Sequence, residues 1–258
     1  MILTGDYHTH TKYSHGKGTV LENACAAKEK GLKEIGISDH GFSHPAFGLT
    51  KRKLGGLKID CENATKQTGV KVLRGIESNI LGIDGTVDLK PKFYDAFDIF
   101  LAGLHKFVLF KLGTLFSVSL PDIINTKLGK KTVSKSLVKK NTDMYINVVK
   151  KNPVDIITHL NYYAYADSLE VAKVCEDYGT FIELNSKKVH LTDDEVADMV
   201  AKTNVKFIID SDAHSADRIG EISLVEDLLK RVEVPTDRIV NINGQTPEFR
   251  FKAFKEKA

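Results

Sequence analysis

The chain has 258 residues, of which 42% are hydrophobic and 28% charged, and its formal net charge is +3. This composition excludes a disordered chain and a strongly basic one, so charge gives no reason to expect a nucleic-acid partner. The length accommodates one α/β barrel as well as two small domains, and the order of the secondary-structure elements has to decide between them.

Short apolar runs rich in β-branched residues recur along the chain and predict seven strands. The first ends at "DYHTH" (6–10), and the others cover 33–40, 70–80, 97–105, 154–160, 179–186 and 205–214. Patterns with one apolar face predict helices between them, at 21–30, 57–67, 138–151, 169–178, 193–202 and 222–232, and a terminal helix at 248–258. Apolar strands that alternate with helices are typical of parallel sheets, whose faces are both buried. The sequence therefore predicts an α/β fold, either a barrel or an open sheet.

Two segments depart from this alternation. In "NILGIDGTVDL" (79–89), apolar residues alternate around Asp84-Gly85, which predicts a hairpin turn. The connection at 106–141 is unusually long and contains eight lysines but one acidic residue, Asp122. It is expected to be either a solvated helix and loop or a basic lid beside an anionic substrate.

The sequence also bears on the cellular compartment. Asp6 and His8 precede any apolar core of a secretory signal, and the apolar stretch 99–120 is interrupted by His105, Lys106 and Lys111, so it makes a poor membrane span. The three cysteines are Cys25, Cys61 and Cys175. Because they are odd in number and lack C-x-x-C spacing, they predict reduced, mostly buried thiols. A cytoplasmic protein without a membrane partner is expected.

Polar side chains lie at or near the carboxyl ends of the predicted strands. In parallel α/β folds these ends share one rim, where active sites are built, so the side chains are expected to converge. His8 and His10, two residues apart on a strand, should project from the same face. The set found in this way is His8, His10, His40, Glu77, His105, His159, Asp212 and His214.

This set predicts a metal centre, because so many titratable groups could not be desolvated together without cations to hold them. A zinc-like ion takes about four or five ligands, so the donors exceed the needs of one ion and suit two to three divalent ions with a bridging carboxylate. Imidazole and carboxylate donors accept zinc, manganese and iron. We expect zinc, and manganese and iron stay as alternatives.

The same residues carry a resemblance to a known family. "DYHTHTKYSHG", "GISDHG", "LRGIESNI", "AGLH", "IITHL" and "IIDSDAH" resemble the successive motifs of the polymerase and histidinol phosphatase (PHP) family, in order, over residues 5–243. Stand-alone bacterial PHP phosphatases with a trinuclear metal site look most similar, because "LRGIESNILGIDGTVD" resembles their third motif and hairpin.

The resemblance implies a single PHP domain over 1–258, with 106–141 as an extended insertion. It implies a distorted, TIM-like (β/α) barrel of seven parallel strands with metals at the strand carboxyl ends. The implied ligand sets are His8, His10, Glu77 and Asp212; Glu77, His105 and His159; and His15, His40 and His214. Glu77 would bridge the first two metals, and only His15 is added to the residues found from the strand ends.

Two features depart from the family pattern. In many relatives the fifth-strand histidine precedes proline, whereas Leu160 and Asn161 follow His159 here. The connection 106–141 is longer than the family leads one to expect. Both features lie beside the expected pocket, so they bear on the substrate more than on the chemistry.

The expected activity is metal-dependent hydrolysis of a small phosphate monoester. A hydroxide that bridges two cations would attack phosphorus in line, with Glu77 and Asp212 as the catalytic carboxylates that hold the metals, so no protein nucleophile is required. Lys106 and Arg218 are expected to serve the phosphoryl or leaving group, because cationic side chains suit its oxygens.

Other polar residues are secondary candidates. Asp39 and Lys187 are further rim residues, and Asp39 would suit orientation of a neighbouring imidazole. His44 and His190 are expected to be structural.

Two alternative functions stay open. A phosphodiesterase or nuclease of the polymerase-associated PHP type would use the lysine-rich insertion with Tyr162, Tyr163 and Tyr165 as a basic and aromatic surface, although tyrosines after a strand more often pack inside. A non-catalytic metal-binding scaffold would keep the ligands without turnover. The expected partner is a small phosphorylated substrate rather than nucleic acid, and the sequence defines neither that substrate nor the oligomeric state.

Overall fold

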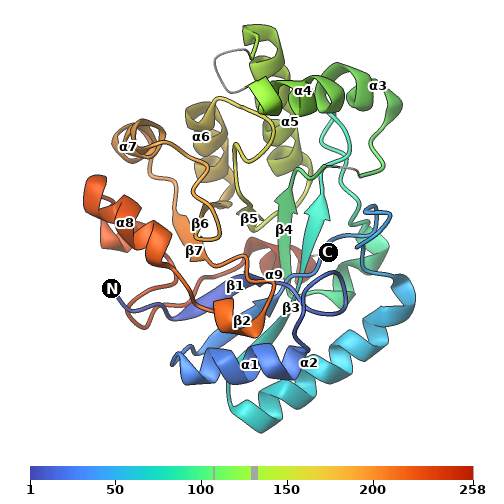
Figure 1. Cartoon of the computed structure of the whole chain (residues 1–258), viewed down its shortest axis with the longest axis vertical. Coiled ribbons are helices and arrows are strands. Elements are labelled where there is room, and N and C mark those ends of the chain that lie inside the picture. Colours follow the sequence, from blue (N-terminus) through green and yellow to red (C-terminus); the bar gives the residue numbers. More distant parts are fainter. Residues whose placement is uncertain (107, 129–132, 258) are drawn as a thin grey trace.

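Seven parallel strands form the centre of the computed structural model, which describes residues 1–106, 108–128 and 133–257 (Figure 1). The strands are β1 (Gly5–Thr9), β2 (Glu34–Ile37), β3 (Lys71–Asn79), β4 (Ile99–Gly103), β5 (Ile156–Ile157), β6 (Phe181–Asn185) and β7 (Phe207–Asp210). Their order in the sheet is their order in the chain, and each pairs in parallel with the next. All seven predicted strands are confirmed.

The two edges of this sheet approach each other and nearly close it into a barrel. Thr9, the last residue of β1, forms a parallel bridge with Ala213, which lies just beyond β7. The backbone N–H of His10 donates to the carbonyl of Ala213 at 2.8 Å, and that of Tyr7 donates to Asp210 Oδ1 at 2.6 Å. The structure is therefore a TIM-like α/β barrel rather than an open sheet.

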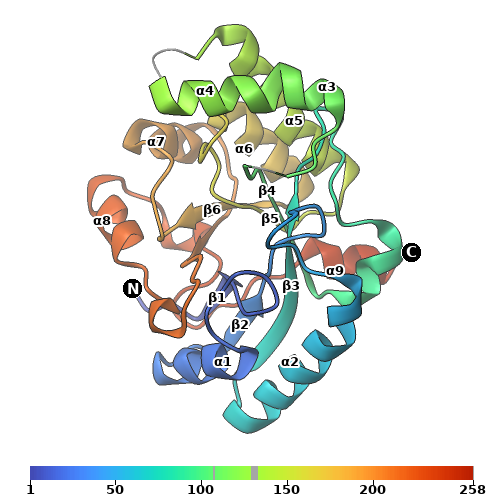
Figure 2. The same cartoon turned by 45° about the vertical axis from the view of Figure 1, so that its right-hand side comes forward.

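Helices surround the strands, as the two views of the molecule show (Figures 1 and 2). They are α1 (Val20–Glu29), α2 (Leu54–Thr68), α3 (Leu112–Thr114), α4 (Leu120–Leu128), α5 (Lys135–Lys151), α6 (Ser168–Tyr178), α7 (Asp193–Lys202), α8 (Ser223–Arg231) and α9 (Arg250–Lys255). Short 3-10 helices lie at Lys51–Lys53, Pro91–Ala96, Ala216–Arg218 and Thr236–Arg238. The predicted helices are confirmed, with ends that differ by a few residues.

Local sequence explains where several helices begin and end. The Thr19 hydroxyl accepts the N–H of Glu22 while Glu22 accepts the N–H of Thr19, a capping box that fixes the first turn of α1. Thr192 and Glu195 do the same for α7. At the other end, α2 stops at Gly69, whose φ of 80° is readily adopted only without a Cβ.

The two irregular segments are ordered in different ways. Ile80 and Val87 form an antiparallel bridge across the predicted hairpin turn, and Gly85 has a φ of 82°. In the insertion, α3 continues through a π-helix (Leu115–Ser119) into α4, and the start of α5 follows. The insertion is thus largely helical in its described part, which both predicted alternatives allow, while residues 107 and 129–132 lie outside the described part.

The barrel interior changes from apolar to polar along the strands. Phe181, Glu183 and Asn185 share one face of β6; the first belongs to a buried apolar cluster with side chains of β1, β4, β5 and β7, whereas the other two make polar contacts. The polar layer therefore lies at the carboxyl ends of the strands. In Figure 1 the arrowheads of β3 and β4 point toward this end, where α3 and α4 also lie.

Two further expectations concern the whole chain. Cys61 and Cys175 are buried free thiols, whereas Cys25 is free but exposed. Within the described residues, no helix combines the length and apolar character needed to cross a bilayer.

Asp155 lies at the amino-terminal end of β5 and links β4 to α9, so its removal should lower the stability of the fold. The buried carboxylate accepts the N–H groups of Phe100 on β4 and Phe251 on α9, each at 2.8 Å. Asp155→Ala leaves both donors without an acceptor, so we expect a loss of about 2–4 kcal/mol in the free energy of unfolding, measured with urea. Asp143→Ala, which removes an exposed partner of Lys139, is the control and should cost about 0.5 kcal/mol or less. Equal losses in the two variants would contradict the role given to Asp155.

Candidate metal centre

A cleft of about 410 Å³ opens at the carboxyl ends of the strands, where the sequence predicted convergence. Its lining consists of His15, His40, Glu77, His105, His159, Tyr162, Lys187, Lys188, His190, Asp212 and His214. His8 and His10 lie fully buried beneath it. All nine residues expected as metal ligands are thus brought together.

Glu77 on β3 lies at the centre of the cluster. Its Oε1 is 2.7 Å from His159 Nε2, 3.0 Å from His105 Nε2 and 3.3 Å from His8 Nε2. Its Oε2 is 2.8 Å from His40 Nδ1. The two oxygens face different sets of rings, which is the arrangement that a bridging carboxylate requires.

The first expected ligand set has distances suited to one tetrahedral ion. His8 Nε2 lies 3.1 Å from His10 Nε2 and 3.3 Å from Glu77 Oε1. Asp212 Oδ1 lies 3.4 Å from His10 Nε2 and 3.9 Å from His8 Nε2. Zinc–ligand bonds of about 2.0–2.2 Å place tetrahedral ligands about 3.3–3.6 Å apart. His8, His10 and Asp212 therefore have donor atoms close enough to share one ion, and Glu77 Oε1 lies beside His8.

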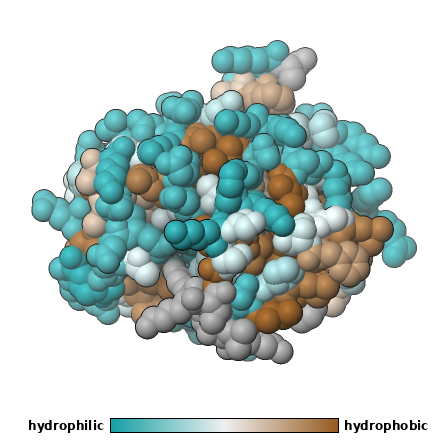
Figure 3. Space-filling model, turned by 90° about the horizontal axis from the view of Figure 1, so that it is seen from above, coloured by the Kyte–Doolittle hydropathy of each residue, from teal (hydrophilic) through white to brown (hydrophobic). Residues whose placement is uncertain are grey.

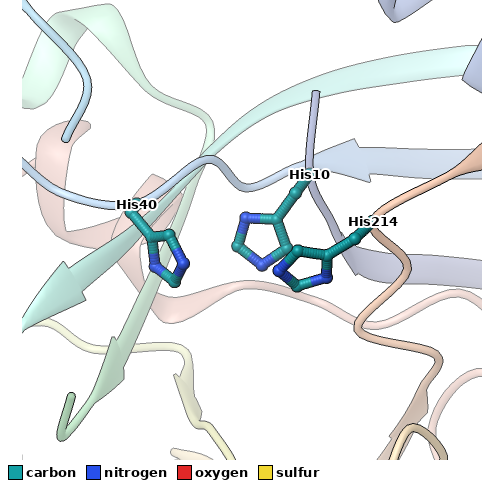
Figure 4. Close-up of side chains that lie close together, drawn as sticks. All are labelled: His10, His40 and His214. Carbon is teal, nitrogen blue, oxygen red and sulfur yellow. The ribbon is translucent and has the colours of Figure 1, made fainter. Parts of the chain in front are cut away.

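A second group of rings lies on the other side of His10. The rings of His10, His40 and His214 point toward one another from the loops after β1, β2 and β7 (Figure 4), and their nitrogens are close enough to share an ion. The ring of His15 stacks on that of His40 at 4.7 Å and lies 4.3 Å from that of His214. His15, for which strand position gave no signal, thus joins this group.

Buried polar residues behind the rings fix their orientation. Glu183 Oε1 accepts from His8 Nδ1 at 2.6 Å, which leaves Nε2 facing Glu77. Asn79 Nδ2 donates to Asp88, so its Oδ1 accepts from His105 Nδ1 at 2.9 Å and again leaves Nε2 inward. Such partners set the tautomer and the basicity of ligating imidazoles.

Several buried atoms of the cluster lack a hydrogen-bond partner among the described residues. They are His10 Nδ1, His15 Nδ1 and His159 Nδ1. Buried polar atoms are normally paired, and one explanation for a group of unpaired ones is an ion that binds them. The donor set, the distances between donors and these atoms all fit divalent metal ions.

The electrostatics of the side chains favour the protonation states that ligation needs. Burial opposes ionisation of Glu77 and Asp212, but the neighbouring imidazoles outweigh it and hold the pKa of each carboxyl well below its usual range. Burial lowers the pKa of His15 to about 3 and that of His105 to about 4. His8 and His159 differ, because the carboxylates around them overcome burial and raise the pKa of each ring. Ionised carboxylates and mostly neutral imidazoles are the metal-binding forms.

Two expected ligands have strained backbone conformations. His159 and Asp212 have φ angles of 30° and 48°, in the left-handed region that non-glycine residues rarely adopt. Gly103 leaves the space that the site needs, since a Cβ there would lie 2.8 Å from His159 Cε1 and closer still to the Thr158 hydroxyl. Strain of this kind persists where the surrounding structure enforces it, and it is common at functional sites.

The loop that carries His15 is held by Asp39. The Asp39 carboxylate accepts the N–H of Thr11 at 2.8 Å and the hydroxyls of Thr11 and Ser14. Asp39 thus orients a ligand-bearing loop rather than contacting a ring through a hydrogen bond.

The cationic side chains differ in their distance from the cluster. Lys187 Nζ lies 3.3 Å from Asp212 Oδ1 and 3.1 Å from His214 Nδ1. Lys106 lies over the ring of Tyr162, 5.7 Å from its centre, and neither Lys106 nor Arg218 is among the residues that line the cleft. The structure thus brings Lys187 closer to the expected ligands than the two cations first favoured from the sequence.

Some site residues carried no signal in the sequence. Glu183 lies within an apolar strand and Asp88 follows the hairpin, so nothing in their local pattern links them to His8 or His105. His190, expected to be structural, lines the cleft with its ring 4.9 Å from that of Tyr162. His44 lies behind His40, with ring centres 5.9 Å apart, and accepts the N–H of Phe47.

Comparison with known proteins adds independent findings. A family model described as the PHP domain matches residues 6–193. A protein of Caldanaerobacter subterraneus subsp. tengcongensis, named a probable phosphatase, is 31% identical over 248 residues, which cover 93% of this chain and 87% of that protein. A protein of Thermoanaerobacter sp. with the same description is 31% identical over 259 residues, which cover 96% of this chain and 95% of that protein.

A solved structure shares the fold. The crystal structure of histidinol phosphate phosphatase from Lactococcus lactis, complexed with zinc, L-histidinol and phosphate, superimposes with a TM-score of 0.61. The two chains are 16% identical, and the match covers 91% of this chain and 95% of that one. The family model ends before Asp212 and His214, but the matches to whole relatives span more than nine-tenths of the chain. The motifs, the family model and these relatives agree, and the chain belongs to the PHP domain family.

Proposed function

We propose that the protein is a metal-dependent phosphatase that hydrolyses a small phosphate monoester in the cleft above Glu77. The observation that carries this proposal is the position of Glu77, whose two oxygens contact imidazoles from four different strand ends. The description of the relatives as probable phosphatases supports it, and so does the zinc and phosphate reported for the Lactococcus structure.

The proposed ligands are the nine residues expected from the sequence. His8, His10, Glu77 and Asp212 form one set, Glu77, His105 and His159 a second, and His15, His40 and His214 a third. Divalent ions held there would supply hydroxide near neutral pH and neutralise phosphate oxygens. Glu77 and Asp212 contribute the negative charge that holds the ions, and Glu183 and Asn79 keep the imidazole lone pairs inward.

Residues at the mouth would bind the rest of the substrate. Lys187 reaches the boundary between the first and third ligand sets, where its ammonium group suits a phosphate oxygen or the departing alkoxide. Lys188, Tyr162 and His190 complete that wall. A volume of about 410 Å³ lies in the usual range for small-molecule sites, which favours a small substrate.

Removal of the central carboxylate should abolish metal binding and activity together. In Glu77→Ala, the imidazoles keep their places but lose the anion that offsets the charge of the ions. We expect at least one equivalent of metal to be lost by elemental analysis and phosphatase turnover to fall by about a thousandfold or more. Glu62→Ala, an exposed glutamate on α2, is the matched control and should retain both. Wild-type turnover in Glu77→Ala would refute the bridging role.

A substrate panel separates the proposed function from its alternatives. Metal-replete protein should hydrolyse phosphorylated metabolites or p-nitrophenyl phosphate, lose this activity with a chelator and regain it with zinc or manganese. Faster turnover of a dinucleotide or single-stranded DNA would favour the diesterase. Absence of turnover on every substrate would favour a metal-binding scaffold.

The cationic residues can be compared by substitution. Lys187→Ala should reduce kcat/KM by about tenfold or more, the loss expected for one charge-assisted hydrogen bond, while the metal content is retained. Lys187→Arg should restore part of the loss. A larger effect of Lys106→Ala or Arg218→Ala would instead support the residues favoured from the sequence.

A further inference from the structure

The helical part of the insertion exposes large apolar side chains to solvent and buries several polar ones. From α3 through the π-helix into α4, the buried positions are the polar residues Thr114, Ser119 and Asp122 together with the apolar Val118, which belongs to the core. The outward positions include Leu112, which is 74% exposed, and Phe116, which is 66% exposed. A surface helix normally turns its apolar stripe toward the core.

The polar contacts of the inner face hold this orientation. Thr114 Oγ1 accepts the N–H of Ile83 at 3.2 Å, and the hydroxyls of Ser119 and Tyr163 lie 2.7 Å apart. Asn141 Nδ2 donates to Asp122 Oδ1 at 3.1 Å. A rotation that buried the leucines would break all of these hydrogen bonds, so the outward apolar face is part of the folded state.

The exposed apolar residues lie four positions apart along the helix and form what we call the apolar stripe. Because the π-helix between α3 and α4 has more residues per turn than an α-helix, residues four apart stay on the same face. The stripe consists of Leu112, Phe116, Leu120 and Ile124. Figure 3 looks down on the end of the molecule that carries α3 and α4 and shows apolar side chains gathered among hydrophilic ones. Contiguous exposed apolar surface of this kind marks an interaction site more often than chance exposure.

The stripe lies at the end of the barrel where the cleft opens. Leu109, also exposed, donates its N–H to the carbonyl of Ser43 in the loop after β2. Phe47 in that loop and Tyr162 after β5 are further exposed aromatic residues beside the cluster. Apolar side chains thus extend from the helix toward the mouth of the cleft.

The charge around the stripe is basic. The segment 106–141 has eight lysines, and its one acidic residue, Asp122, is buried. Lys111 pairs with Asp84 and Lys139 pairs with Asp143, each at 2.6 Å, whereas Lys135 and Lys140 are exposed at the start of α5. In the described part of this segment, no carboxylate faces solvent to offset them.

We propose that the apolar stripe, together with the exposed Lys135 and Lys140, docks the protein on an anionic lipid surface, with the cleft at the membrane-facing end. The leucines and Phe116 would enter the boundary between headgroups and acyl chains while the lysines contact anionic headgroups. A second copy of the chain fits less well, because a two-fold contact through the stripe would bring like charges together. The expectation of no membrane partner rested on the lack of a spanning segment, but binding of this kind lies in the plane of the interface and needs no such segment.

Vesicle co-sedimentation tests the proposal without reference to turnover. Wild-type protein should bind vesicles of phosphatidylcholine with phosphatidylglycerol, bind pure phosphatidylcholine at least about tenfold more weakly, and lose binding at high salt. The double substitution Leu112→Gln and Phe116→Gln leaves the charge unchanged and should weaken binding to the anionic vesicles by about tenfold or more.

Matched controls distinguish the stripe from apolar exposure in general. Ile59→Gln alters a side chain on α2 that is 57% exposed, and it should bind vesicles like the wild type. Unchanged metal content and circular dichroism in the double variant would show that it is folded. The proposal is overturned by failure of the wild type to bind anionic vesicles, by equal binding of the double variant, or by a wild-type dimer in solution that the double variant abolishes.

Discussion

The structure depends on one electrostatic constraint, the burial of Glu77 and Asp212 among seven imidazoles at the rim of the barrel. Carboxylates and rings this close, with several nitrogens unpaired, would be costly in a folded protein without a compensating charge. The imidazoles hold the carboxyls ionised, and burial keeps most of the rings neutral. Both effects produce a site that is ready to accept cations, and the proposed hydrolytic chemistry follows from those cations.

The rest of the barrel is arranged to hold these groups in place. Glu183 and the pair Asn79 and Asp88 fix ring orientation from behind, and Asp39 ties down the loop that carries His15. His159 and Asp212 adopt left-handed backbone conformations that the local sequence would not choose. The apolar cluster deeper in the barrel provides the rigidity that keeps such residues in position.

The segment 106–141 combines exposed apolar and buried polar side chains. Its helices present leucine and phenylalanine to solvent while serine, threonine and aspartate face inward beside Val118, so hydrogen bonds as well as apolar packing fix their inner face. Because Tyr163 contacts Ser119 and its neighbour Tyr162 lines the cleft, the outer helix and the proposed substrate wall belong to one continuous structure. The proposed lipid-binding stripe and the cleft are therefore physically adjacent.

The sequence by itself determined the strand order, the helix positions and most of the converging polar residues. Apolar runs and amphipathic periods depend on local chemistry, and the carboxyl ends of parallel strands must share a rim, so His8, Glu77 and His159 could be placed without coordinates. Only the tertiary structure placed Glu183 behind His8, Asp88 behind Asn79, and Lys187 nearer the cluster than Lys106 or Arg218. These contacts join residues that are far apart in the chain. They depend on the direction of the side chains and the path of the loops, and local sequence determines neither. The same reason explains the insertion: its lysines and leucines were visible in the sequence, but which of them face water was decided by the polar partners that the fold placed beneath the helix.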